Sequence, residues 1–492
     1  MSLNWHNVKL KNYIYPILIG TIFLIGIVLR LKFYITNYPL WHDECSLAMS
    51  IINKNIWEYF GLLDYNQSAP PIFMMITKLF ANMFGIKEFV LRLLPFICGI
   101  ASIPVFYYFS KMFLDKKFAL VIANFLFAIN YHLIHYSLEF KQYSSDVLLF
   151  MLCCILCSKV DLKNINLNKL ILLTGIFTIS PMFSIPTVFV ILGFLIHQIV
   201  LHKKEILKNI LIVSGITFSI WAIYAFNTIL PQQSQKFIMD GLYWENGFIT
   251  FNLKSLLGLI RINLLYYLYP NKFILFDLIL LITGLCFLLK DFKNKSSAIL
   301  ALSLFFIAIT SYLRQYPIFE RVSLYLIPAI LVLLIIPINK ISPSKKFLCI
   351  MFVFMTLAGL SSYNLSYFKG FSNQDLFHRN NARGAMQDLI KHYENHENYI
   401  IVNSASKSEF NYYKKYFDFN PEKVLIVQTP QYSETEYLKS LDMLPSNNDY
   451  WFYYAYDYSH SPVIPFLKEY SKQYTIRYEN NIGGSYLLNL HK

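Results

Sequence analysis

The sequence ILIGTIFLIGIVL at residues 17–29 decides the fold, together with ILFDLILLITGLCFLL at residues 274–289. A helix of a soluble core keeps a polar face toward water, and neither stretch offers one. Similar apolar runs recur from Tyr13 to Phe368, separated by short polar breaks. Since about 20 mostly apolar residues cross a bilayer as a helix, the sequence predicts a polytopic α-helical membrane protein.

The apolar runs are long enough for about eleven transmembrane helices. Residues 70–84 are also apolar, but this run is short and begins with two prolines, so we expect a helix at the membrane interface. The expected crossings are residues 13–33, 89–110, 118–136, 144–158, 169–182, 184–201, 209–228, 273–289, 296–313, 322–338 and 347–367.

The lysines between the apolar runs predict the orientation. If the N-terminus lies inside, every inside loop carries lysine, as the positive-inside rule requires. Counting residues 70–84 as a crossing would break this pattern. The outside then receives residues 34–88, residues 229–272 and the C-terminal tail. The inside lysines are Lys9, Lys11, Lys111, Lys116, Lys117, Lys159, Lys163, Lys169, Lys203, Lys204, Lys208, Lys290, Lys293, Lys295, Lys340, Lys345 and Lys346.

The composition supports the same class of protein. Of the 492 residues, 56% are hydrophobic and 15% are charged, whereas soluble domains average about 25% charged residues. The formal net charge of +14 comes from lysine clusters that set the orientation, so no nucleic-acid partner is expected. The seven cysteines lie mostly in apolar segments and imply no disulfide framework.

The tail after residue 368 reads as ordinary globular sequence. Helical periodicity is found at Ala382–Tyr393 and Glu434–Leu441. The alternation of helices and strands predicts a small α/β domain, 369–492, after a transmembrane domain, 1–368. We expect this outer domain to recognise the acceptor or to cap the site. The strands, rich in β-branched and aromatic residues, are expected at Tyr399–Asn403, Val424–Gln428, Tyr450–Tyr456 and Ser485–Leu490.

The first outer loop begins with Trp41-His42-Asp43-Glu44, which contains the first acidic pair of the chain. Because it directly follows a membrane helix, Asp43 is a candidate general base beside the membrane surface. A solvated carboxylate near the lipid headgroups is the alternative, and the sequence leaves both open.

The second outer turn carries Glu139, Lys141, Tyr143 and Asp146. Ionisable residues this close to a membrane helix are costly, and they usually serve a site or pair with one another. Glu139 and Asp146 share a face only if one helix continues through both, because they are about two turns apart. A cluster in which Glu139, Lys141 and Asp146 neutralise one another is the alternative.

Two arginines begin apolar spans on the outer side, Arg92 and Arg321. Positive charge is not needed there for orientation. Arg321 could hold a phosphate through a bidentate contact. Pairing with Glu320, or extension of the side chain to the interface, is the alternative.

These features, in this order, resemble the membrane glycosyltransferases with the GT-C fold, in the group of protein O-mannosyltransferases and the lipid A aminoarabinose transferase. The resemblance covers about residues 30–340. Ser68-Ala69 departs from the lysine of the aminoarabinose enzymes, so neither their sugar nor their metal site is carried over. The matching features are Asp43-Glu44, Pro70-Pro71 before an apolar stretch to Phe84-Gly85, Leu91-Arg92-Leu93, His135-Tyr136-Ser137 before Glu139, Lys141 and Tyr143, and Tyr316-Pro317 with Arg321 before Leu326-Ile327-Pro328.

The resemblance implies transfer of a sugar from a polyprenyl-phosphate donor to an extracytoplasmic acceptor, which could be a glycolipid, an envelope glycan or a protein. In the family, the residue matching Asp43 acts on the acceptor, and basic residues hold the lipid phosphate, here Arg321 and Lys141. We expect inversion at the sugar carbon, with Glu44 assisting Asp43. The further expected binding residues are His42, Arg92, Glu139, Tyr143 and Asp146.

We expect no obligatory metal, although Asp43 and Glu44 could bind a divalent cation weakly. The composition suggests a bacterial protein, which places the chain in the cytoplasmic (inner) membrane with an extracytoplasmic site. A transporter or flippase, a glycan ligase or polymerase, and a non-catalytic relative that binds a lipid-linked sugar remain alternatives. The absence of a detected internal repeat argues against the transporter.

Overall fold

The structure is a computed structural model that describes residues 4–202, 206–234, 245–268, 274–340, 380–393, 398–427, 441–442, 444, 448–455, 463–482 and 484–492. The chain forms two compact units. The helical unit comprises Met1–Thr36, Ile56–Leu62 and Ser68–Leu365. The loop–tail unit comprises Asn37–Asn55, Leu63–Gln67 and Ser366–Lys492.

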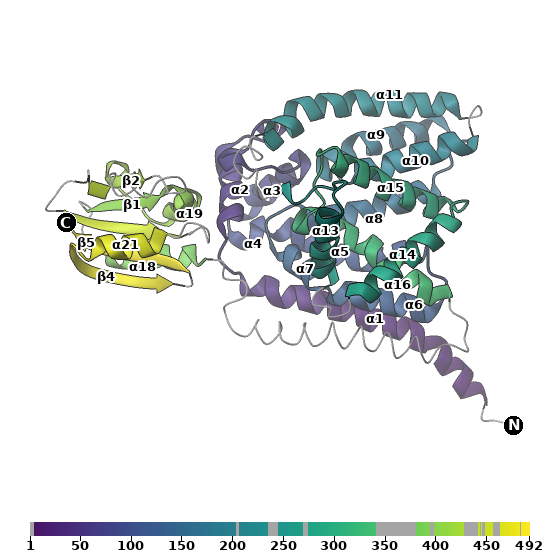
Figure 1. The fold of residues 1–492 in the computed structure, drawn as a ribbon, viewed down its shortest axis with the longest axis horizontal. Helices are drawn as coiled ribbons and strands as arrows, with labels where there is room; N and C mark the ends of the chain where they lie inside the picture. Colours follow the sequence, from purple (N-terminus) through teal and green to yellow (C-terminus); the bar gives the residue numbers. More distant parts are fainter. Residues whose placement is uncertain are drawn as a thin grey trace. The chain divides into compact units, whose positions relative to one another are not determined.

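The helical unit is built almost entirely of helices (Figure 1). Here η marks a 3₁₀ or π segment. Its elements are α1 (Asn4–Thr36), η1 (Ile56–Phe60), α3 (Pro71–Phe84), α4 (Glu88–Leu91), α5 (Leu93–Ser110), α6 (Lys117–Ile129), α7 (Tyr131–His135), η3 (Tyr136–Leu138), α8 (Tyr143–Lys159), α9 (Leu167–Phe183), α10 (Thr187–His202), α11 (Leu207–Tyr224), η4 (Ala225–Ile229), α13 (Leu253–Leu268), α14 (Ile274–Lys290), α15 (Lys295–Tyr312), η5 (Glu320–Leu326) and α16 (Ile327–Lys340).

The predicted crossings coincide with these helices, apart from residues 347–367, which lie outside the described residues. By length and composition, five helices of the described chain can cross a membrane, and a bent pair of helices would make a sixth. Pro71–Phe84, Leu167–Phe183 and Thr187–Val200 are shorter apolar helices. The protein is thus a multi-pass membrane protein, while the number of about eleven crossings stays a prediction.

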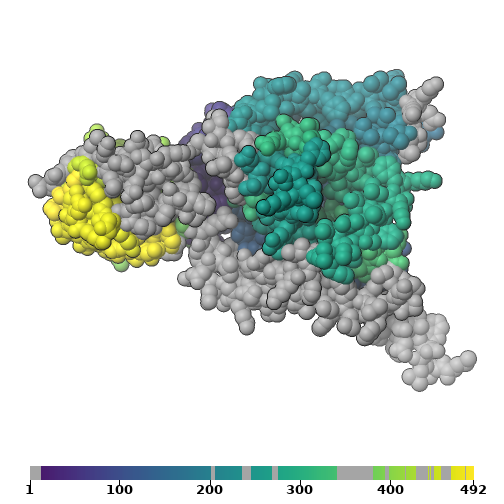
Figure 2. Space-filling view, viewed as in Figure 1, coloured from purple at the N-terminus to yellow at the C-terminus, as the bar shows by residue number. Residues whose placement is uncertain are grey.

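The outer surface of this unit is apolar where lipid is expected. In α11, which packs along α9, the side chains of Leu211, Ile216 and Ile223 are exposed, and so is that of Phe226 in the following segment η4. α11 forms part of the teal band at the upper edge of Figure 2. A soluble protein rarely exposes so continuous an apolar surface, so this helix fits a lipid environment.

Close helix contacts fix the interior of the unit. α10 packs along α15, α5 along α8, and α14 along α16. At the last of these contacts a Cβ atom on Gly284 would overlap the backbone of Leu333. Small residues allow such close approach of membrane helices, where packing and not the hydrophobic effect holds helices together.

A break between α6 and α7 shapes the outer end of the unit. The two helical segments are bent by 51° at this point. The side chain of Asn130 accepts a hydrogen bond from the Leu133 amide at 3.1 Å and so begins the new helix. Arg30 of α1, fully buried, donates to the carbonyl of Ala128 at 3.1 Å. The arginine thereby satisfies a carbonyl group beside the break.

The tail of the loop–tail unit contains a five-stranded mixed sheet in the order β2-β1-β3-β5-β4. β1 pairs in parallel with β2 and β3, whereas β5 pairs antiparallel with β3 and β4. The described elements of the tail are α18 (Ala382–His392), β1 (Tyr399–Asn403), η7 (Ser404–Ser406), α19 (Lys407–Tyr413), η8 (Lys414–Tyr416), η9 (Pro421–Lys423), β2 (Val424–Val427), β3 (Asp449–Tyr454), α21 (Val463–Ser471), β4 (Thr475–Ile482) and β5 (Ser485–His491).

The predicted small α/β fold of the tail is confirmed. The four predicted strands correspond to β1, β2, β3 and β5. β4 was not predicted, because this edge strand is largely exposed and carries polar residues such as Arg477, Asn480 and Asn481. The helix predicted at Glu434–Leu441 falls almost entirely outside the described residues.

The loop–tail unit also includes part of the first outer loop, namely α2 (His42–Asn53) and η2 (Asp64–Asn66). α2 packs against α19 of the tail. The division expected at residue 368 assigned this segment to the transmembrane domain. Its packing with the tail is a tertiary relationship between stretches that lie far apart in the sequence.

Candidate functional site

The predicted second outer turn is buried inside the helical unit. Glu139 is 6% exposed, Lys141 1% and Asp146 4%. The backbone turns tightly between them, where the Lys141 amide donates to the Glu139 carbonyl at 2.7 Å. A buried ammonium group is stable only with compensating partners, so this segment is a structured polar region and not a solvated loop.

A close approach by α5 sets the position of this segment. Gly99 lies so near η3 that a Cβ atom at that position would overlap the Cβ of Ser137 and lie 3.2 Å from its hydroxyl. Ser137 is immediately followed by Leu138 and Glu139. Only a residue without a side chain lets η3 sit this close to α5.

Aromatic and histidine side chains surround the segment. The Tyr136 and Tyr266 hydroxyls are 2.5 Å apart, and the His132 ring stacks on Tyr266 with a centroid distance of 3.8 Å. Tyr143 meets Tyr136 edge to face at 5.3 Å. The His135 Nε2 atom lies 4.0 Å from the Glu139 carboxylate. The first turn of α8 is therefore joined through Tyr136 to α13.

The same helix α13 holds the segment that carries Arg321. The Asn263 side chain donates to the Ile318 carbonyl at 2.8 Å and accepts from the Glu320 amide at 3.2 Å. This anchors Glu320, whose φ of 42° is unusual for a side-chain-bearing residue. Arg321, half-buried, follows at once.

Tyr266 contacts Tyr136 and also lies close to Arg321. Burial raises the pKa of its hydroxyl well above the ordinary value, nearby Tyr136 and Glu320 act in the same direction, and Arg321 opposes them. The hydroxyl is therefore protonated at neutral pH and can serve as a hydrogen-bond donor. η5, which carries Arg321, packs against α7, α8 and α13, the helices that precede and follow the Glu139–Lys141 turn and the helix that carries Tyr266.

Two other predicted site residues of the helical unit, Arg92 and Asp146, contact different parts of the unit. Arg92 is buried at the junction of α4 and α5, close enough to Tyr34 to interact electrostatically. Asp146 lies against Ser184, at the end of α9. Asp146 thus faces the α9–α10 connection.

The acidic segment of the first loop belongs to the loop–tail unit. Asp43 is half-buried in the first turn of α2. Glu44 is fully buried, and its carboxylate accepts a hydrogen bond from the Trp41 amide at 3.3 Å. This is the backbone contact of a helix-capping glutamate. His42 is half-buried, and its Nδ1 lies 3.1 Å from a carboxylate oxygen of Glu409 in α19.

Metal-binding geometry is absent from the described parts of the chain, where no three His, Cys, Asp or Glu side chains gather closely enough to hold an ion. The expectation that no metal is obligatory stays a prediction.

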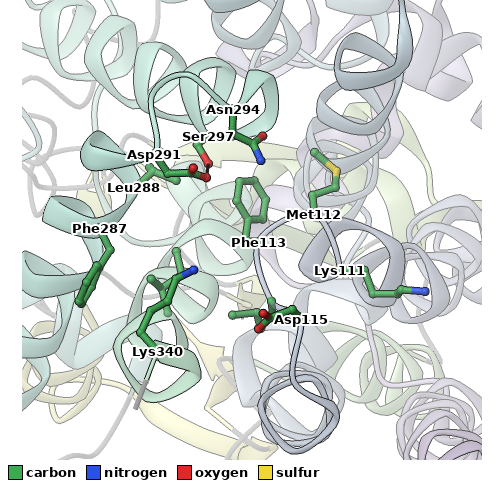
Figure 3. A pocket seen from close by; sticks show the side chains of 12 residues that line it. Lys111, Met112, Phe113, Asp115, Phe287, Leu288, Asp291, Asn294, Ser297 and Lys340 are labelled. Carbon is green, nitrogen blue, oxygen red and sulfur yellow. Dashed lines mark hydrogen bonds between the residues drawn. The ribbon is translucent and has the colours of Figure 1, made fainter. Parts of the chain in front are cut away.

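A cavity of about 300 Å³ lies elsewhere in the helical unit (Figure 3). Its polar walls include Asp115, Asp291 and Lys340, and the Ser297 hydroxyl donates to Asp291 at 2.8 Å. The walls come from the lysine-bearing connections that the sequence predicts inside the cell. We therefore do not assign this cavity to the candidate site.

Sequence reasoning missed several residues of this arrangement. Asn263 and Tyr266 lie three positions apart on α13, and that spacing would have placed them on one helix face. His132 had no role in the prediction, while His135 and Tyr136 entered only through the family resemblance. Glu409 gave no signal, because a single carboxylate in a surface-like stretch is ordinary. The roles of the predicted residues stay predictions.

A comparison with known protein families independently supports the resemblance drawn from the sequence. The family model of dolichyl-phosphate-mannose-protein mannosyltransferases matches residues 68–226, a range that includes Arg92 and the Glu139–Asp146 segment. No curated protein sequence matches the chain significantly.

Two solved structures of ArnT share the fold at low sequence identity. ArnT from Cupriavidus metallidurans bound to undecaprenyl phosphate is similar over 99% of this chain and 98% of that chain, with 9% identity and a TM-score of 0.54. The apo structure of the same protein is similar over 95% of this chain and 97% of that chain, with 9% identity and a TM-score of 0.53. The Archaeoglobus fulgidus oligosaccharyltransferase with Zn and sulfate has 14% identity and a TM-score of 0.48, over 80% of this chain and 61% of that one.

The ArnT structures thus share their fold with both the transmembrane part and the tail of this chain. The family match covers the stretch that contains the buried polar segment of the helical unit. Together, the family match and the shared fold confirm the resemblance drawn from the sequence: this chain is a multi-pass membrane protein with the GT-C fold.

Proposed function

We propose that this protein transfers a sugar from a polyprenyl-phosphate donor to an extracytoplasmic acceptor. The mannosyltransferase family match supports the reaction class, and the undecaprenyl phosphate bound to ArnT supports this type of lipid carrier. The observation that carries the proposal is the packing of η5 against α7, α8 and α13. Arg321 lies close enough to Tyr266 to interact electrostatically, and the Tyr266 hydroxyl contacts that of Tyr136. We expect buried Lys141, five residues after Tyr136, to face the same polar region.

Such a region suits the leaving group. Polyprenyl phosphate gains charge as the sugar departs, and preorganised donors in a site shielded from water stabilise that charge. The Arg321 guanidinium would contact two phosphate oxygens, with Lys141 as a second cation and Tyr266 as a neutral donor. Arg92, Glu139, Tyr143 and Asp146 would bind and orient the substrates, Glu139 with His135 beside it.

The chemical step is one displacement at the anomeric carbon. An acceptor hydroxyl or amine attacks that carbon and forms the new glycosidic bond. The bond from the carbon to the phosphate oxygen breaks, and its electron pair leaves with polyprenyl phosphate. Asp43 takes the proton of the acceptor, and the configuration inverts. Glu44, which caps α2, and His42 would support Asp43.

Replacement of the proposed base tests this role directly. General-base catalysis contributes about 100- to 10,000-fold, so Asp43→Asn should lower kcat by that factor while donor binding is kept. The rate of sugar transfer is measured with purified protein in liposomes that contain polyprenyl-phosphate sugars. Asp418→Asn, at an exposed tail carboxylate, is the matched control. Near wild-type transfer by Asp43→Asn removes this residue from the role.

The proposed phosphate contact has its own test. Arg321→Ala should raise the donor KM at least tenfold, since a charge-assisted hydrogen bond contributes about 1.5–3 kcal/mol. Arg314→Ala is the control, because Arg314 is exposed and precedes η5. An unchanged donor KM would contradict the assignment. Transfer should also persist after chelator treatment, and its loss would show that a metal is required.

The acceptor class and the location are part of the proposal. We place the protein in a bacterial cytoplasmic membrane with the site on the outer side. Intact-mass comparison of envelope glycolipids and glycoproteins, with and without the gene, should reveal a product one sugar lighter when the gene is missing. Flipping of a lipid-linked sugar by the purified protein, without sugar transfer, would instead support a transporter.

A further inference from the structure

The tail holds both ends of the acidic loop segment within the loop–tail unit. The Arg383 guanidinium donates to the Asn37 carbonyl at 3.0 Å. The Leu40 amide donates to the Tyr413 hydroxyl at 2.8 Å. Further along the loop, the Asn411 side chain donates to the Tyr65 hydroxyl at 2.8 Å. These bonds join stretches that more than 300 positions separate in the sequence.

A fourth contact between the loop and the tail, between His42 and Glu409, differs from these because its groups are ionisable and Glu409 is buried. Both carboxylate oxygens of Glu409 lie close to the His42 Nδ1 atom, at 3.1 and 3.2 Å. The Ser408 hydroxyl donates to the same carboxylate at 2.8 Å. The Glu409 side chain is only 1% exposed. A buried carboxylate is retained only where hydrogen bonds and charge compensate its lost hydration.

This contact lies at the residue that begins α2. His42 immediately precedes Asp43, and both lie in the first turn. The Trp41 amide is already held by Glu44, and Leu40 is held by Tyr413. A contact at His42 therefore completes the attachment of the turn that carries Asp43. The return of the loop is fixed as well, since the Asp64 amide donates to Ser50 at 2.8 Å.

We infer that Glu409 is a positioning residue of the transferase, which holds the first turn of α2 through His42 and so orients the Asp43 carboxylate. The tail is then part of the catalytic apparatus and not solely a cover or an acceptor-binding domain. This inference rests on the proposed role of Asp43. Its structural half, the attachment of α2 through Glu409, is independent of that role.

Kinetics separate positioning from substrate binding. Glu409→Ala should lower kcat about 10- to 100-fold, because misplacement of a catalytic group by about 1 Å has an effect of that order. Donor KM should change less than about twofold, since the inference assigns Glu409 to the positioning of the acceptor's base and not to donor binding. Glu409→Gln keeps an oxygen that accepts from His42 and should retain most of the rate. Glu422→Ala, at an exposed tail position, is the matched control.

Cys45 supplies a readout that does not depend on activity. It lies in the same first turns of α2 and is fully buried. In the full-length protein, alkylation of Cys45 is followed by mass spectrometry of its peptide, with buried Cys98 of α5 as an internal reference. Glu409→Ala should accelerate alkylation of Cys45 at least about tenfold and leave Cys98 protected, because a local opening exposes only this segment.

Each outcome bears on the inference. Unchanged kcat in Glu409→Ala, or unchanged protection of Cys45, overturns it. If Glu409→Ala exposes Cys45 while Asp43→Asn keeps full activity, the attachment stands and the proposed base fails. If Glu409→Ala also exposes Cys98 and so unfolds more widely, Ser408→Ala decides, because it removes only the hydroxyl that orients Glu409. A rate and a Cys45 protection equal to wild type in that variant would then overturn the inference.

Discussion

The contact between Gly99 and Ser137 offers a sharp test of how the helical unit positions the candidate site. Gly99→Ala adds one methyl group where it would overlap the Ser137 Cβ and lie 3.5 Å from the Ser137 Cα. Carbon atoms rest about 3.5–4.0 Å apart, so α5 and η3 must separate by about 1 Å. Overpacking of this kind costs about 1–3 kcal/mol. Tyr136 and Glu139, on either side of Ser137, move with η3.

The expected kinetic result follows from that displacement. The 2.5 Å contact between Tyr136 and Tyr266 would be lost or distorted. A shift of about 1 Å can cost about 100-fold in rate, which corresponds to about 2.7 kcal/mol in the activation free energy. We therefore expect Gly99→Ala to slow sugar transfer about 100-fold in liposomes, with a lower midpoint of thermal unfolding.

A control and a rescue make the test specific. At Gly175 of α9 an added Cβ would meet no atom within 4 Å, so Gly175→Ala should be neutral or slightly stabilising. Ser137→Gly removes the overlapping Cβ, so the double variant should recover much of the rate. Residues in contact typically couple by about 0.5–3 kcal/mol. Wild-type activity of Gly99→Ala, or additive effects in the double variant, would refute the reasoning.

Three further predictions concern the supporting structure. Asn263→Ala leaves the Ile318 carbonyl and the Glu320 amide without their described partner; donor KM should rise about tenfold, and an unchanged KM would argue against this anchor. Arg30→Leu removes the donor to the Ala128 carbonyl and should destabilise the protein by about 1–3 kcal/mol. The midpoint of thermal unfolding should therefore fall, and a midpoint equal to that of the wild type would contradict the prediction. Burial raises the pKa of Tyr453 and, together with the Asp388 hydrogen bond, that of Tyr478. Both raised pKa values mean that folding favours the neutral hydroxyl, so this contribution to the stability of the tail should be present below about pH 10 and be lost as the pH rises further. Tyrosinate absorbance and the circular dichroism of the whole protein should therefore change together. Ionisation of these tyrosines without loss of structure would contradict the prediction.

Much of the architecture could be predicted because the bilayer constrains it strongly. A helix that faces lipid must be apolar along its length, so stretches such as residues 17–29 identify themselves. The four strands recognised in the tail are rich in β-branched and aromatic residues, and β3 and β5 are buried along almost their whole length. The exposed strand β4 went unrecognised because its residues are mostly polar.

The candidate site could be predicted only in part. Glu139, Lys141 and Arg321 stood out because a charged group beside an apolar span is costly and unusual. Tyr266 and Asn263 did not, because tyrosine and asparagine are ordinary in an outer loop. Their importance comes from contacts with Tyr136 and Glu320, which other elements contribute.

The sequence alone determined that this chain crosses a membrane repeatedly, carries a small α/β tail and resembles the GT-C glycosyltransferases, because hydrophobic length, strand composition and motif order are local properties. Only the tertiary structure decided that the Asp43 segment packs with the tail through Glu409, and that α13 joins Arg321 to the Glu139 segment. These are long-range contacts whose geometry depends on how distant stretches of the chain pack. The identity of a residue alone does not reveal which distant residue it will contact.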